Sequence, residues 1–147
     1  MGIAERWKGF RELPEDIDRA LGRLVPLFER EGVLLAYVFG SLARGHKAHD
    51  VDIAILIREK PAYLLRGKIS ECLGTERVDL VDLSKAPPLL RFEIVRSGRC
   101  LYARDKEVLN RFEMETVHLY RDTAYLRKRQ SEVLKRRISQ WSMKEES

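Results

Sequence analysis

The stretch that decides the fold is residues 39–56, FGSLARGHKAHDVDIAIL. Gly40 and Ser41 follow a continuous apolar run of strand length, and Asp50 and Asp52 open a second apolar run. Glycine and serine at the end of such a run are typical of a tight turn. The stretch therefore predicts two consecutive strands, with a turn after the first and two carboxylates at the start of the second.

The two aspartates are expected on the same side of the second strand. Because side chains alternate across a strand, Val51 and Ile53 point to the other side and pack on helices, while Asp50 and Asp52 face outward. Carboxylates held this close repel each other unless a cation lies between them. Hard divalent ions such as Mg²⁺ take oxygen ligands and keep substrate phosphates in their remaining positions. The pair predicts half of a metal site whose other half is a polyphosphate.

The later run RVDLVDL offers two candidates for a third carboxylate, Asp79 and Asp82. They are an odd number of residues apart, so they face opposite sides of the strand. Val78 and Leu80 share the helix-packed side with Asp82, which leaves Asp79 to join the aspartate pair. A third carboxylate lets two metals bind, one lowering the pKa of an attacking hydroxyl and one neutralising the leaving group. Asp82 is interpreted as a strand-end or cap residue.

The glycine-serine turn has features of a phosphate-binding element. Gly40 lets the backbone approach a phosphate without a Cβ in the way. Ser41 adds a hydroxyl, and the N–H groups of the turn point at anions as helix N-termini do. Arg44 can then reach a phosphate oxygen. The turn therefore predicts a phosphate-binding element facing Asp50, Asp52 and Asp79.

Helix and strand patterns alternate along the chain. Helices are expected at residues 14–32, 61–73, 87–98 and 105–142, and strands at 33–39, 50–57, 77–83 and 99–103. This order predicts an α+β fold, a small mixed sheet with helices packed mainly on one face. Residues 1–147 are expected to form a single domain with a C-terminal helical extension over about 105–142.

The expected last helix is unusual in its length and charge. A continuous helix over 105–142 would be roughly 55 Å long, so it either breaks or projects from the body. Its distal part, RKRQSEVLKRR, carries six basic residues and one acid. We interpret it either as a solvated face or as a docking arm through which the chain forms homo-oligomers or hetero-oligomers.

Composition narrows the classes of partner and compartment. Lys and Arg outnumber Asp and Glu by 28 to 23, a net charge of +5 that favours phosphates or acidic surfaces. No apolar run approaches the length of a membrane span, and residues 1–10 lack the apolar core of a signal peptide, so a cytoplasmic protein is expected. Direct nucleic-acid binding is not expected, because the basic residues gather on the last helix without interleaved aromatics.

Taken together, the motifs YVFGSLARG, DVDIAIL and VDLVDL resemble those of the DNA polymerase β-like nucleotidyltransferase superfamily, in particular its smallest branch, the minimal nucleotidyltransferases. The segments LLRFEIVRSGRCLYARD and RFEMETVHLYRD are similar to the C-terminal half of MntA-type antitoxins. The resemblance extends from about Pro14 to Tyr125.

This resemblance implies both a site and a partner. It implies that Gly40 and Ser41 contact the nucleotide phosphates, that Asp50 and Asp52 bind Mg²⁺, and that Asp79 completes the metal site. It also implies that the partner is a HEPN-domain toxin ribonuclease. The toxin would be silenced when AMP from ATP is transferred to its tyrosine.

Two other functions compete with the antitoxin enzyme. An antitoxin that works by contact alone is kept open by the loop from Gly45 to Asp50, which is shorter than is usual in the family. A small-molecule adenylyltransferase is disfavoured, because such enzymes usually need a further domain to hold the acceptor. Turnover of ATP in the presence of the partner separates these classes.

Arg111, His118 and Tyr120 match the spacing of the HEPN ribonuclease motif, which would make this chain the toxin itself. HEPN domains are helical bundles, whereas strands are expected in the first hundred residues of this chain. We therefore interpret the match as accidental.

Overall fold

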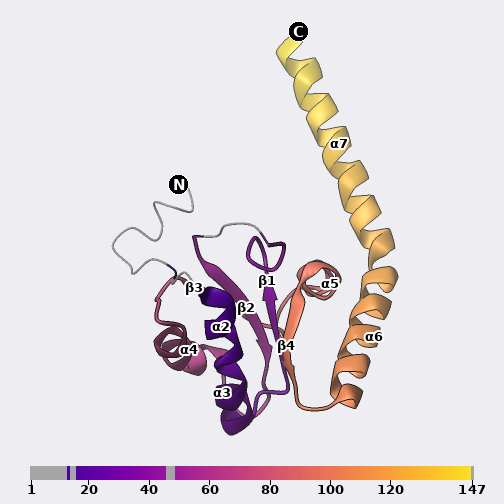
Figure 1. Ribbon diagram of the computed structural model, residues 1–147. Helices are drawn as coiled ribbons and strands as arrows, with labels where there is room; N and C mark the ends of the chain where they lie inside the picture. Colours follow the sequence, from indigo (N-terminus) through magenta and orange to yellow (C-terminus); the bar gives the residue numbers. More distant parts are fainter. Residues whose placement is uncertain (1–12, 14–15, 46–48, 147) are drawn as a thin grey trace.

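Four strands form the central sheet of the computed structural model, which describes Leu13, residues 16–45 and residues 49–146. They are β1 (Leu35–Phe39), β2 (Val51–Leu56), β3 (Val78–Asp82) and β4 (Arg99–Ala103). Their order in the sheet is β3-β2-β1-β4. β1 pairs antiparallel with β2 and β4, whereas β2 and β3 run parallel. The predicted α+β fold with a small mixed sheet is confirmed (Figure 1).

Helices follow the strands in the order expected from the sequence. They are α2 (Ile17–Gly22), α3 (Leu24–Glu31), the 3-10 helix η1 (Ala62–Leu65), α4 (Arg66–Leu73), α5 (Pro88–Ser97), α6 (Lys106–Asp122) and α7 (Ala124–Glu146). The helix expected at 61–73 begins as η1 directly after Pro61 and continues as α4. No helix in the described part of the chain combines the length and apolar character needed to cross a membrane.

The helix expected at 14–32 is divided at Arg23 into α2 and α3. Pro26 explains the division. Its ring is tolerated in the first turn of α3, but in a continuous helix it would clash with the carbonyl group of Gly22. Residues 14–15 of the expected helix lie outside the described residues.

The larger hydrophobic cluster lies between one face of the sheet and α2, α3 and α4. Val51, Ile53 and Ile55 of β2 are fully buried in it, together with Leu24 and Phe28 of α3. This is the side that strand alternation predicted for the apolar residues of β2. Its burial orients the opposite side chains of the same strand towards the other face.

The described helices α5 and α6 cover part of the other face. Along β2 it carries Asp52, then Ala54 and Leu56, and the last two are buried against α5 and α6. Tyr37 of β1 joins this second cluster, and its hydroxyl donates a hydrogen bond to Glu113 of α6 over 2.9 Å. Burial, and then this hydrogen bond, raises the pKa of the Tyr37 hydroxyl. α5 and α6 thus close one half of the face and leave the aspartate half to the functional site.

α6 and α7 follow each other with only Thr123 between them. The Thr123 hydroxyl donates to the carbonyl of Leu119 over 2.8 Å, while its backbone N–H donates to the same carbonyl over 3.0 Å. A threonine bonded back in this way bends a helix. The long C-terminal helix expected from the sequence is therefore present with a bend, and its end projects beyond the sheet (Figure 1).

Glu31, at the end of α3, ties that helix to the segment of η1 and α4. Its carboxylate accepts hydrogen bonds from Lys60 and Lys68, and only 9% of the residue is exposed. The bonds from Lys60 and then Lys68 lower the pKa of Glu31 from 4.5 to about 2. The ionised carboxylate therefore stabilises the fold above pH 4.5, and this contribution is lost as the pH falls towards 2.

We expect Glu31→Gln to be less stable than the wild type at pH 7, with the difference shrinking as the pH falls from 4.5 to 2. Urea unfolding of both proteins at a series of pH values measures this difference in the free energy of unfolding. Glu107→Gln is the control, because Glu107 forms an exposed helix pair with Arg111 that contributes little to stability. A Glu31→Gln deficit that stays constant down to pH 2 would show that the ion pairs do not act through ionisation of Glu31.

Candidate functional site

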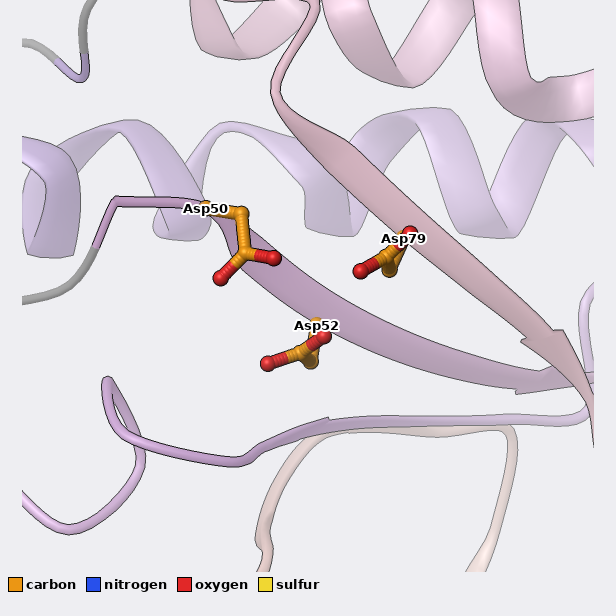
Figure 2. A group of neighbouring side chains, drawn as sticks. All are labelled: Asp50, Asp52 and Asp79. Atoms are coloured by element: carbon orange, nitrogen blue, oxygen red, sulfur yellow. The ribbon is translucent and has the colours of Figure 1, made fainter. Parts of the chain in front are cut away.

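The structure brings three carboxylates together on one face of the sheet, at the N-terminal ends of β2 and β3 (Figure 2). Asp50 directly precedes β2, Asp52 lies within β2, and Asp79 lies within β3. One carboxylate oxygen from each lies within 4.8 Å of those of the other two. In Figure 2 all three side chains point into the same space.

The pairing of β2 with β3 creates this cluster. Asp52 and Asp79 are direct partners across the parallel ladder, as are Val51 and Val78. The backbone N–H of Val51 donates to the carbonyl of Arg77 over 2.8 Å, which joins the start of β2 to the residue before β3. The register places Asp79 on the same face as Asp52, as alternation along the strand predicted. The sequence predicted Arg77 as the first residue of the strand at 77–83, whereas β3 begins at Val78 and Arg77 contributes its carbonyl group to the pairing.

Asp82 has a different role from Asp79. Its Oδ1 accepts a hydrogen bond from the backbone N–H of Ser84 over 2.9 Å and one from the Ser84 hydroxyl over 2.6 Å. Both bonds form the turn that ends β3. The expectation that Asp82 is a strand-end residue is confirmed.

The Gly40 turn lies against Asp52. Phe39, the last residue of β1, pairs with Asp52 across the antiparallel ladder, so the chain turns away next to the carboxylate. Gly40 has φ of +74°, and a Cβ added there would lie 2.3 Å from Asp52 Oδ2. Position 40 therefore requires glycine for two reasons, the left-handed backbone and the closeness of a carboxylate oxygen.

The residues after Gly40 form a short helical turn. The N–H of Arg44 donates to the carbonyl of Ser41 over 3.2 Å, and the N–H of Gly45 donates to the carbonyl of Leu42 over 3.1 Å. Ser41 is half-buried at the start of this turn, and Arg44 is exposed at its end. Because Gly40 lies against Asp52, the turn begins beside the carboxylates.

The donor set determines what the site can bind. Three carboxylates offer oxygen ligands, which magnesium and other hard divalent cations prefer. Asp52 and Asp79 are half-buried, so within the described part of the chain both remain partly accessible. Carboxylates this close also repel one another, and a divalent cation between them reduces that repulsion. The cluster therefore fits a divalent metal site open to a phosphate-bearing ligand.

The Arg111, His118 and Tyr120 set lies on α6. Arg111 forms an ion pair with Glu107 over 2.8 Å, and His118 is exposed. The ring of Tyr120 is stacked against the ring of Phe92 at a centroid distance of 3.8 Å. Tyr120 therefore has a packing role between α5 and α6.

Comparison with known proteins gives concordant results. A family model described as Polymerase beta, Nucleotidyltransferase matches residues 23–107. Protein adenylyltransferase MntA of Shewanella oneidensis is 32% identical over 93 residues, which cover 58% of this chain and 65% of that protein. The chain thus spans just under two thirds of the length of this relative.

Solved structures share the architecture. One chain in a crystal structure of a toxin-antitoxin with AMP-PNP is 26% identical, with a TM-score of 0.64 over 78% of this chain and 98% of that chain. A second similar chain comes from the structure of tri-AMPylated Shewanella oneidensis HEPN toxin in complex with MNT antitoxin. It is 24% identical, with a TM-score of 0.63 over 80% of this chain and 98% of that chain. This likeness supports the fold. On the family match, this chain belongs to the polymerase beta nucleotidyltransferase family.

Proposed function

We propose that this chain is a Mg²⁺-dependent nucleotidyltransferase that moves AMP from ATP to a tyrosine hydroxyl of a HEPN-family toxin, and so serves as its antitoxin. The observation that carries the proposal is the meeting of Asp50, Asp52 and Asp79 beside the Gly40 turn. The relative named protein adenylyltransferase MntA supports the reaction class. The likeness to a toxin-antitoxin chain solved with AMP-PNP supports both the nucleotide and the kind of partner.

Asp50, Asp52 and Asp79 would hold the metal. When bound, it would neutralise phosphate charge and lower the pKa of the attacking hydroxyl. The three side chains come from the start of β2 and from the neighbouring parallel strand, so the sheet fixes their spacing. A rigid set of ligands needs little reorganisation during the reaction.

The turn after β1 would hold the nucleotide phosphates. Because Gly40 has no Cβ, the turn lies directly against the Asp52 carboxylate. Phosphates held by the turn would therefore also lie close to the metal ligands. Ser41 offers a hydroxyl and Arg44 a guanidinium, which suits phosphate oxygens. With the carboxylates on the other side, the phosphates would lie between a donor-rich turn and the metal ligands.

The transfer itself is a substitution at phosphorus. The tyrosine oxygen forms a bond to the α-phosphorus of ATP, and the bond from that phosphorus to the oxygen of the β-phosphate breaks. Pyrophosphate leaves, and the hydroxyl proton passes to a carboxylate of the site. The chain's contribution is to align the acceptor oxygen with the α-phosphorus and to stabilise the charge that develops.

The direct test combines the purified chain, the HEPN-family protein of the same genome, Mg²⁺ and ATP labelled at the α-phosphate. The proposal predicts that label moves to a tyrosine of the HEPN-family protein and that its toxicity is lost. Neutralisation without any transfer of label would instead establish an antitoxin that acts by contact alone.

Asp79→Asn is expected to reduce transfer by about a thousandfold, equal to ~4 kcal/mol of lost transition-state stabilisation. Asp82→Asn is the matched control in the same strand, because Asp82 forms the Ser84 turn and faces the other side of the sheet. It should lower stability and leave most of the transfer rate intact. Rates measured with labelled ATP decide, and a larger loss in the Asp82 variant would contradict the assignment of Asp79.

Gly40→Ala is expected to weaken binding of a non-hydrolysable ATP analogue with Mg²⁺ by about tenfold or more, equal to ~1.4 kcal/mol. The reason is that the new Cβ displaces the Asp52 carboxylate. Gly45→Ala is the control, since Gly45 has φ of +76° but no atom within 4 Å of an added Cβ. Both variants carry backbone strain of about 1–2 kcal/mol, and only the first should lose affinity. The affinities are measured by calorimetry. If Gly40→Ala and Gly45→Ala bind the ATP analogue with equal affinity, the turn is not a nucleotide-binding element.

A further inference from the structure

α7 presents a set of exposed apolar side chains. From Ala124 to Ser142, every side chain except that of Arg127 is exposed. Five large apolar side chains between 42% and 71% exposed lie on one side of this helix: Leu126, Val133, Leu134, Ile138 and Trp141. At about 100° per residue they fall within an arc of about 140°. We call these five residues the α7 stripe.

The positive charge of the chain is concentrated on the same helix. Residues 124–142 hold six basic residues and one acid, a net charge of +5, which equals the net charge of all 147 residues. Arg129 and Arg137 border the same hollow as Leu126 and Val133 of the stripe. A complementary surface must therefore be mainly apolar and must also supply negative charge to arginines that lie within and beside the stripe.

The direction of α7 is fixed by contacts at its base. The Arg127 guanidinium lies 3.9 Å from the ring centroid of Tyr120, whose ring is also stacked on Phe92 of α5. The same guanidinium donates to the Thr123 hydroxyl and to the Tyr120 carbonyl, each over 2.6 Å. A binding element that is already ordered loses less conformational entropy when it docks. α7 is thus held ready for a partner outside its own fold.

Three kinds of partner fit this surface poorly. A second copy would bring a helix of net charge +5 against another of +5. A nucleic acid would satisfy the arginines but leave the α7 stripe in water. A lipid surface requires a continuous apolar face, whereas Gln130 and Arg137 lie within the arc of the stripe. A protein groove can bury the stripe and supply carboxylates to Arg137 and its neighbours.

We propose that α7 is a docking helix that lies in a mainly apolar groove that also carries carboxylates, on the same protein that accepts AMP. This inference rests on the proposed function for the identity of that protein. α7 would raise the local concentration of the acceptor at the enzyme, while the carboxylates on the sheet face perform the transfer. Loss of docking should therefore change the concentration of acceptor that is required, not the rate at saturation.

The test uses Leu134→Glu/Ile138→Glu, which places two charges in the α7 stripe. The control Ser139→Glu/Ser142→Glu adds the same two charges to exposed positions outside the stripe. Binding to the HEPN-family protein of the same genome is measured by calorimetry, and AMP transfer is measured over a range of its concentrations. The stripe variant is expected to bind at least about tenfold more weakly than the control and to raise KM by a similar factor, with kcat unchanged.

The outcomes separate the two proposals. Tight binding that depends on the stripe, without AMP transfer, leaves docking in place and overturns the proposed reaction. Equal binding by the stripe and control variants, or no binding by the wild type, overturns the docking helix. It is also overturned if the wild type alone forms dimers through the stripe in light scattering, or if α7 binds RNA or anionic vesicles while the HEPN-family protein does not compete.

Discussion

The position of β2 between β1 and β3 is the constraint on which the rest of the structure depends. Asp52 pairs with Phe39 on one side and with Asp79 on the other. The first pairing places the Gly40 turn at the carboxylate, and the second adds a further carboxylate to the cluster. Because side chains alternate across a strand, a shift of one residue in either register would turn one of these groups into the isoleucine core. The hydrophobic cluster beneath the sheet therefore maintains the geometry of the site above it.

The sheet face opposite α2, α3 and α4 has two halves that differ in what they contact. α5 and α6 close its far half, and among the described elements neither of these helices covers its aspartate half, where the proposed metal and nucleotide would bind. Closure of the far half also fixes the base of α7, through the stacking of Tyr120 on Phe92 and the cation-π contact of Arg127. The fold thus connects the carboxylate cluster and a projecting helix to one sheet.

Local patterns in the sequence predicted the strands, the face of each aspartate and the choice of Asp79 over Asp82, because alternation and turn residues act over short distances. They did not predict the pairing of β4 with β1, or the hydrogen bond from Tyr37 to Glu113, which joins residues 76 positions apart. Nor did they predict that the Gly40 backbone lies against the carboxylate of Asp52, since this depends on the strand register. Pro26 predicts an interruption of the first helix from the sequence alone, and the helix divides at Arg23.

The most direct test of the central claim is a crystal structure of the chain with Mn²⁺ and a non-hydrolysable ATP analogue, with data collected at the manganese absorption edge. An anomalous peak is expected within coordination distance of Asp50, Asp52 and Asp79. The analogue's phosphates are expected to lie against the backbone of Gly40 and Ser41. A nucleotide bound elsewhere, or a carboxylate cluster without manganese while the nucleotide is bound, would contradict the central claim.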